Sequence, residues 1–147
     1  MLKEALDKKS DLQKFLFIRG FLVTDKKIEN LEDFPFYGNW NETHRDGYYF
    51  YTHNKTSVHF ASNGKVTLFL LGHCYDPFLM EIEEEKILTD ILKDYGTDKY
   101  YDRISEITGV YVTGAIENGQ VKFSVDPSGM QSGCYGVIDG NFYLSSH

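Results

Sequence analysis

The sequence predicts an α+β domain in which strands come first and last and two helices lie between them. Aromatic residues, which strands accommodate well, make up 16% of the 147 residues. Asn-Gly or Asp-Gly pairs at 63–64, 118–119 and 139–140 separate β-rich runs, as two-residue hairpin turns do. Residues 83–107, between the two β-rich halves, carry the apolar spacing of amphipathic helices.

The first part of the chain contains an expected helix, a strand and a loop. Apolar residues spaced among lysines and acids in 1–14 predict a short surface helix, which we interpret as an N-terminal extension before a domain spanning 15–147. Phe15–Thr24 (FLFIRGFLVT) predicts a buried strand in which Gly20 marks a bulge or a close backbone approach. Residues 25–41 are expected to form a loop, followed by a turn at 44–47.

The remaining elements follow from the same patterns. The acids from Glu83 onward suit the positive end of a helix dipole, and Tyr95-Gly96 ends that helix. A second helix is expected from Asp98 to about Ile107. A turn at Asn54-Lys55 is expected to join the second and third strands. After the first, the strands are expected at Tyr48–His53, Ser57–Ala61, Val66–Tyr75, Gly109–Glu117, Gln120–Asp126, Gly136–Ile138 and Asn141–Ser145.

Charge and composition exclude several classes of function. Lys and Arg number 15 and Asp and Glu 22, so the net charge is −7 and a nucleic-acid partner is not expected. The longest apolar run, Val66–Gly72, is too short to span a membrane. Cys74 and Cys134 form no CxxC pair, which favours a reducing, cytoplasmic compartment with both thiols buried as small hydrophobes. No metal or cofactor is expected.

A few residues are candidates for chemistry. Cys74 lies beside His73, a pairing that can activate a thiolate, although adjacent strand residues point to opposite faces. His53 and His59 would face each other across the Asn54-Lys55 turn and are the one histidine pair to consider as metal ligands; the alternative is that both are simply solvated or hydrogen-bonded. The acidic run Glu81–Glu85 is either a cation site or a solvated helix start. Asp126-Pro127-Ser128-Gly129 is either a turn or a ligand loop.

The second half of the chain resembles a known family. The helix ending in Tyr-Gly, the D-P-x-G motif of Asp126, Pro127 and Gly129, and the final Phe142–Ser146 strand occur in a characteristic order. They are similar to the class II glutamine amidotransferase domain of asparagine synthetase-like proteins. Upstream, Leu70–Asp76 (LLGHCYD) resembles the family's F-N-G-E-I-Y-N segment, and Leu16–Gly20 (LFIRG) lies where that family begins with C-G-I-x-G.

The resemblance implies a fold and a site. The fold would be a four-layer α/β/β/α sandwich of two antiparallel sheets, as in N-terminal nucleophile hydrolases. Leu16 replaces the family's N-terminal cysteine nucleophile, and Leu71 replaces the asparagine of its oxyanion hole, so that only the backbone N–H of Gly72 would remain of that hole. A vestigial ligand pocket would involve Gly72, Tyr75, Asp126 and Gly129.

We therefore expect a degenerate amidotransferase-like domain without glutaminase activity. It would act as a scaffold or interaction module for an ATP-dependent amide-forming synthetase domain or protein. Two alternatives stay open: a fragment or subunit of an active asparagine synthetase-like amide ligase, or an enzyme that reuses the pocket with Cys74 and His73. Self-association is also left open.

Overall fold

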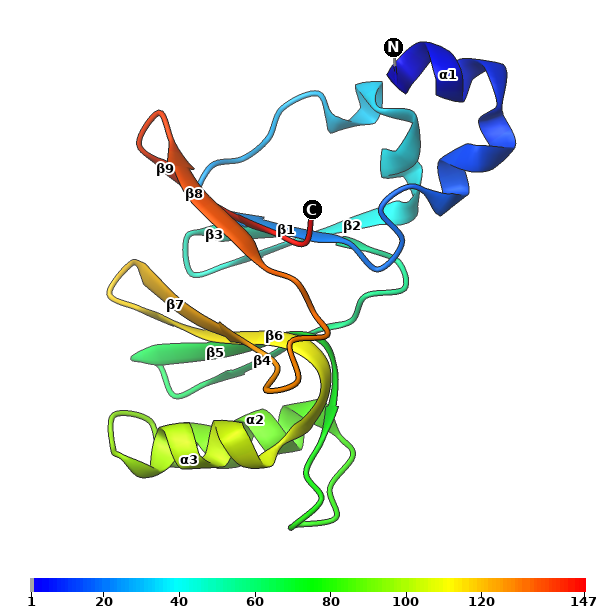
Figure 1. Cartoon of the computed structure of the whole chain (residues 1–147). Helices are drawn as coiled ribbons and strands as arrows, with labels where there is room; N and C mark the ends of the chain where they lie inside the picture. The colour runs from blue at the N-terminus through cyan, green and yellow to red at the C-terminus, as the bar shows by residue number, and fades with distance from the viewer. Residues whose placement is uncertain (1) are drawn as a thin grey trace. The chain divides into compact units, whose positions relative to one another are not determined.

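The structure is a computed structural model that describes residues 2–147 and has a mixed α+β fold with two antiparallel sheets (Figure 1). This confirms the predicted α+β class with antiparallel sheets. Contacts divide the chain into two compact units. Unit 1 consists of the chain up to Thr56 together with Cys134–His147, and unit 2 is Ser57–Gly133. No helix of the described residues is long and apolar enough to cross a membrane.

Unit 1 contains a five-stranded sheet in the order β2-β3-β1-β9-β8, in which every neighbouring pair is antiparallel. Its central strand β1 carries Phe21 and Val23, both buried, between β3 and β9. The strands are β1 (Phe21–Thr24), β2 (Trp40–Arg45), β3 (Tyr48–His53), β8 (Cys134–Ile138) and β9 (Asn141–Ser145). The helices are α1 (Leu2–Lys8) and the 3₁₀ turns η1 (Ser10–Phe15), η2 (Leu31–Asp33) and η3 (Pro35–Asn39).

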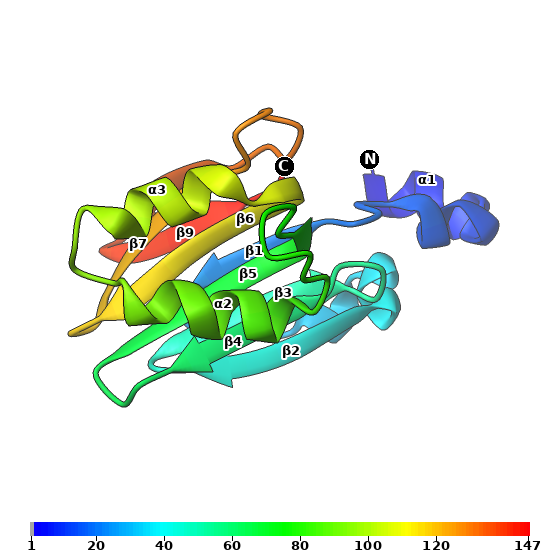
Figure 2. The same cartoon turned by 90° about the horizontal axis from the view of Figure 1, so that it is seen from below.

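Unit 2 contains a four-stranded antiparallel sheet in the order β4-β5-β6-β7, and two helices lie over one of its faces (Figures 1 and 2). The hairpins β4–β5, β6–β7 and, in unit 1, β8–β9 turn at the three Asx-Gly pairs, as predicted. The elements are β4 (Val58–Ser62), β5 (Val66–Tyr75), α2 (Glu84–Lys93), α3 (Lys99–Glu106), β6 (Thr108–Glu117) and β7 (Gln120–Val125).

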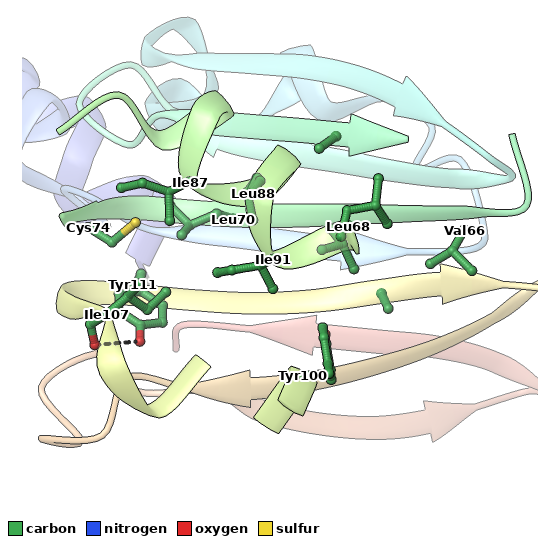
Figure 3. Close-up of a cluster of buried hydrophobic side chains, with 13 residues drawn as sticks. Val66, Leu68, Leu70, Cys74, Ile87, Leu88, Ile91, Tyr100, Ile107 and Tyr111 are labelled. Atoms are coloured by element: carbon green, nitrogen blue, oxygen red, sulfur yellow. Dashed lines mark hydrogen bonds between the residues drawn. The ribbon is translucent and has the colours of Figure 1, made fainter. Parts of the chain in front are cut away.

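The core of unit 2 lies between its helices and its sheet (Figure 3). Helix α2 buries four apolar residues at i, i+1, i+4 and i+5, the spacing of a single helical face. They meet alternate residues of β5, which all point to the helix side because side chains alternate along a strand. The buried cluster is Ala61, Val66, Leu68, Leu70, Cys74, Ile87, Leu88, Ile91, Leu92, Tyr100, Ile107, Tyr111 and Ala115.

Three local predictions were wrong. The expected strand Phe15–Thr24 begins only at Phe21, because Phe17 (φ 51°) and Arg19 (φ 58°) are left-handed and the Gly20 N–H donates to the Phe17 carbonyl at 2.7 Å. The residues of strand β2 were predicted to form a loop and a turn. The strand was missed because it is polar and largely exposed, so its sequence contains no apolar run. Cys134 is exposed, whereas Cys74 is buried as predicted.

The predicted pairing of His53 with His59 was also wrong. His53 lies on β3, which pairs with β1 and β2 in the sheet of unit 1. His59 lies on β4, which pairs with β5 in the sheet of unit 2. The Asn54-Lys55 turn therefore leads from one sheet to the other and closes no hairpin.

Candidate functional site

The structure places Cys74 and His73 on opposite faces of β5. Cys74 is 5% exposed and belongs to the core under α2, whereas the His73 side chain is 72% exposed. Burial, with smaller effects from the Glu84 and Asp76 carboxylates, raises the pKa of the Cys74 thiol to about 12. The thiol is therefore protonated at neutral pH, and the two residues form no activated pair.

His73 instead belongs to a polar cluster at the surface of unit 2. Its Nδ1 lies 3.2 Å from Glu84 Oε1 and 3.4 Å from Ser57 Oγ. A serine triad uses the two ring nitrogens for two different partners, whereas here one nitrogen faces both. The Ser57 hydroxyl also donates to the Gly72 carbonyl at 2.6 Å. The cluster therefore does not activate Ser57.

The same cluster does not have the geometry of a metal site. Glu84 Oε2 lies 3.9 Å from Nε2 of His59, whereas Glu85 Oε1 lies 3.9 Å from Nδ1 of the same ring. The two nitrogens of an imidazole point apart and cannot bind one ion, so the two carboxylates do not share an ion with this histidine. Within residues 2–147, no group of three or more His, Cys, Asp or Glu side chains is arranged to hold a metal.

The acidic run Glu81–Glu85 shapes the start of α2. Glu81 accepts hydrogen bonds from the backbone N–H groups of Ile82 and Glu83, and Glu83 pairs with Lys86 at 2.7 Å. Glu81 and Glu83 thus make local bonds that are typical of the start of a helix. This agrees with the interpretation of the run as a solvated helix start and not with a cation site.

Gly72 and Asp126 lie at the same end of the unit 2 sheet. Gly72 is opposite Tyr111 on the neighbouring strand, and the Asp126 N–H donates to the Tyr111 carbonyl at 3.0 Å. Tyr75 lies at the end of β5, opposite Thr108, and is half exposed. Three of the four residues of the expected vestigial pocket thus share one end of the sheet, and Gly129 follows in the loop after β7.

The backbone at position 72 requires a glycine. Its φ is 112°, and a Cβ at this position would lie 2.3 Å from the Val110 carbonyl oxygen. Its N–H donates to the Ser57 carbonyl at 2.9 Å. The amide that the resemblance assigns to an oxyanion hole is therefore already used within the sheet. Leu71, at the adjacent position, is 1% exposed and has no polar side-chain atom to donate.

Asp126 stabilises the loop that follows β7 through hydrogen bonds to its carboxylate. Its buried carboxylate accepts the Ser128 hydroxyl and the backbone N–H groups of Met130 and Gln131, at 3.1 and 2.7 Å for the two backbone bonds. Burial alone would raise the pKa of Asp126, but these hydrogen bonds outweigh it and lower the pKa below its usual value. Asp126 therefore stabilises a turn, which is one of the two interpretations that the sequence of residues 126–129 allowed.

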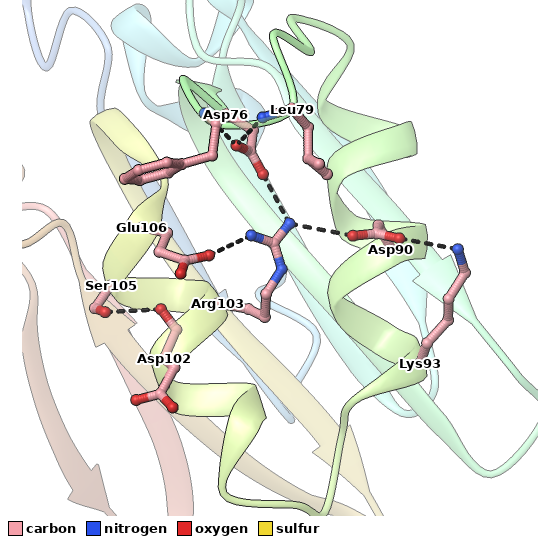
Figure 4. A network of polar contacts seen from close by, with 9 residues as sticks. Asp76, Leu79, Asp90, Lys93, Asp102, Arg103, Ser105 and Glu106 are labelled. Carbon is pink, nitrogen blue, oxygen red and sulfur yellow. Dashed lines mark hydrogen bonds and ion pairs between the residues drawn. The ribbon is translucent and has the colours of Figure 1, made fainter.

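A second Asp-Pro pair, which the sequence analysis did not single out, organises the loop after β5 (Figure 4). The side chain of Asp76 is fully buried and accepts the N–H groups of Phe78 and Leu79, both at 2.9 Å. Its other oxygen receives Arg103 of α3 at 2.7 Å. Arg103 also contacts Asp90 and Glu106. The sequence did contain a signal for this role of Asp76, because an Asp-Pro pair directly follows a strand both here and at 126–127.

The loop that Asp76 holds exposes a series of large apolar side chains. We call residues 77–82, between β5 and α2, the tip loop; its start and end are joined by backbone hydrogen bonds between Asp76 and Glu81. Figure 1 shows it extending away from the end of β5. The exposed fractions are Phe78 72%, Leu79 57%, Met80 87% and Ile82 75%.

The described residues also form cavities, of which three follow, and the tip-loop residues Leu79 and Glu81 line part of the first. One of about 560 Å³ lies along the outer side of α2 and is bordered by acids, including Glu83 and Glu85. A second, of about 530 Å³, lies beside α3 and is bordered by Tyr95, Tyr100 and Tyr101. A third, of about 250 Å³, lies in unit 1 and is mostly aromatic. In the sequence, only the acidic run Glu81–Glu85 pointed to any of these cavities, because Glu81, Glu83 and Glu85 line the first.

Comparisons with family models, with curated proteins and with solved structures gave no match to this chain.

Proposed function

We propose that this chain is a glutamine amidotransferase-like domain that does not hydrolyse glutamine and serves as an interaction module for an ATP-dependent amide-forming synthetase domain or protein. The mixed fold with two antiparallel sheets agrees with this proposal at the level of fold class. The four-layer arrangement of N-terminal nucleophile hydrolases is part of what we propose.

The chemistry of the candidate positions supports the non-hydrolysing half of the proposal. Leu16 and Leu71 have no nucleophilic or donating side-chain atom. The Gly72 amide is bonded to Ser57, and the Cys74 thiol is buried with a raised pKa. An enzyme that reused the pocket through Cys74 and His73 would need both side chains on one face, so that alternative is disfavoured.

The tip loop is the observation that carries the interaction half. Leaving several large apolar side chains in water costs free energy that binding a partner would recover, and contiguous exposed patches of this kind mark interaction sites. The bonds from Asp76 fix the loop backbone before any partner arrives, which lowers the entropy cost of binding. Glu81 lies within the loop and Glu83–Glu85 follow it directly; these carboxylates would repel an anionic membrane surface, so a protein partner fits better.

The alternative that this domain belongs to an active amide ligase uses the same surface. In that case the synthetase part of the ligase is the partner, and ammonia or an amine replaces glutamine as nitrogen donor. In this version the chain is a fragment or a subunit of the ligase itself.

A photo-crosslinking amino acid at position 80 tests the interaction. Placed in the full chain in its source cells, it is expected to crosslink a polypeptide with an ATP-dependent carboxylate-activating domain. The same amino acid at the exposed turn position 65 is the matched control. If position 80 gives no more product than position 65, or the product has no such domain, the proposed function is wrong.

A further inference from the structure

The aromatic cavity of unit 1 has no role in the function proposed above. Its volume is about 250 Å³, and residues brought together from several segments of unit 1 line it. We define it by its six phenyl, phenol and indole rings, which belong to Phe17, Phe21, Phe36, Tyr37, Trp40 and Tyr51.

Contacts between the rings fix the walls of the cavity. Phe36 meets Phe17 edge-on at a centroid distance of 5.0 Å and Trp40 at 6.1 Å, while Tyr37 lies 6.5 Å from Tyr51. A Cβ on Gly20 would lie 2.7 Å from the Phe17 carbonyl oxygen and 3.1 Å from the Trp40 ring. Only glycine therefore lets the turn before β1 approach this closely, and the turn helps to place the Phe17 ring.

Carboxylates lie near the tyrosine side of the cavity. Glu42 on β2 is directly opposite Tyr51 on β3. Burial raises the pKa of Tyr37, and the negative charges of Glu42 and Glu32 raise it further. Burial and Glu42 also raise the pKa of Tyr51, against a lowering effect of the Ile28 N–H that donates to its hydroxyl at 3.0 Å. Both phenols thus lie in a negative potential.

We propose that the aromatic cavity binds a small organic ammonium ion, with the cationic head among the rings near Glu42 and the apolar part against Phe17 and Phe36. Aromatic faces attract alkylammonium groups through their quadrupole, and a cage of several rings is the arrangement that recognises quaternary ammonium ligands. The nearby carboxylates and the chain's net charge of −7 favour a cation over an anion. This proposal is independent of the proposed function.

The chain contains one tryptophan, and it lines this cavity, so its fluorescence reports on the site directly. The probes are choline and its uncharged carbon isostere, dimethylbutanol, which differ in charge at nearly equal size. Choline is expected to change Trp40 emission saturably, and the isostere to bind about tenfold more weakly because it lacks the cation–π attraction. Equal affinities, or no saturable change with choline, would overturn the proposal.

Two variants test whether the ammonium group of choline binds near Glu42. Glu42→Gln removes one charge at an exposed position and is expected to weaken choline binding severalfold while leaving the isostere unaffected. Glu85→Gln is the matched control, because Glu85 belongs to unit 2 and is not paired opposite a ring of the cavity as Glu42 is; it is expected to bind choline like the original chain. Circular dichroism checks that both variants are folded. A Glu42→Gln variant that is folded and binds choline unchanged would contradict the placement of the cation.

Discussion

Arg103 of α3 donates a 2.7 Å hydrogen bond to the fully buried carboxylate of Asp76, 27 residues earlier in the chain. The same carboxylate accepts two backbone N–H groups of the tip loop. The Arg103–Asp76 contact thus connects a helix to the apolar surface that we assign to partner binding. Two further carboxylates on Arg103 keep its guanidinium in place.

Asp76→Ala is expected to destabilise the fold and loosen the tip loop. The substitution leaves the N–H groups of Phe78 and Leu79 without their acceptor and removes one of three carboxylates on Arg103. We expect a loss of about 2–3 kcal/mol in the free energy of unfolding, measured with urea. Asp102→Ala, on the exposed side of α3, is the matched control and is expected to change stability by less than about 0.5 kcal/mol.

The Asp76 carboxylate is also expected to make stability depend on pH in the acid range. Burial alone would raise its pKa, but hydrogen bonds from Leu79, Arg103 and Phe78 outweigh burial and lower the pKa. A lowered pKa means that its stabilisation is complete above the pKa of the unfolded chain, near 3.9, and is lost as the pH falls through the folded value. Between pH 5 and 2, Asp76→Asn is expected to lose less stability than the original chain. Equal losses would contradict this assignment.

Gly72 and Gly136 are expected to respond differently to alanine. At Gly72 a side chain would strain a backbone with φ 112° and collide with the Val110 carbonyl, so we expect a loss of about 3 kcal/mol. A Cβ at Gly136 meets nothing within 4 Å, so its substitution is expected to cost less than about 1 kcal/mol. Thermal unfolding of both variants measures the difference. Similar small effects would show that Gly72 is not required by the backbone.

The two cysteines are expected to differ in reactivity. Cys134 is exposed, whereas Cys74 is buried and its pKa is raised to about 12. A disulfide reagent should therefore modify one thiol of the native chain quickly and the second at least about a hundredfold more slowly, through opening of the core. Cys134→Ala removes the fast phase. A fast reaction that persists in this variant would mean that Cys74 is accessible.

The sequence predicted most of the elements because their signals are local. The strand Val66–Tyr75 and the helix beginning near Glu83 showed their apolar spacing directly, and the Asx-Gly pairs located three turns. The apolar pattern gave a wrong prediction where the backbone conformation of individual residues prevents a strand. The run from Phe15 looks like a strand, yet left-handed residues at 17 and 19 turn the chain before β1.

The candidate site was harder to predict because its properties depend on contacts distant in sequence. The opposite faces of His73 and Cys74 follow from strand geometry and could be anticipated. The bond between Gly72 and Ser57 and the ion pair between Asp76 and Arg103 join separate segments, so spacing alone gave no sign of them. The aromatic cavity likewise gathers rings from residues 17 to 51.

Glutamine turnover tests the central claim most directly. The purified chain is incubated with glutamine, and released ammonia is measured beside a Cys74→Ala variant and a buffer control. Because the Cys74 thiol is buried and the Gly72 amide is already bonded, we predict background ammonia from both proteins. Sustained release from the original chain that disappears in Cys74→Ala would contradict the account and identify an active enzyme.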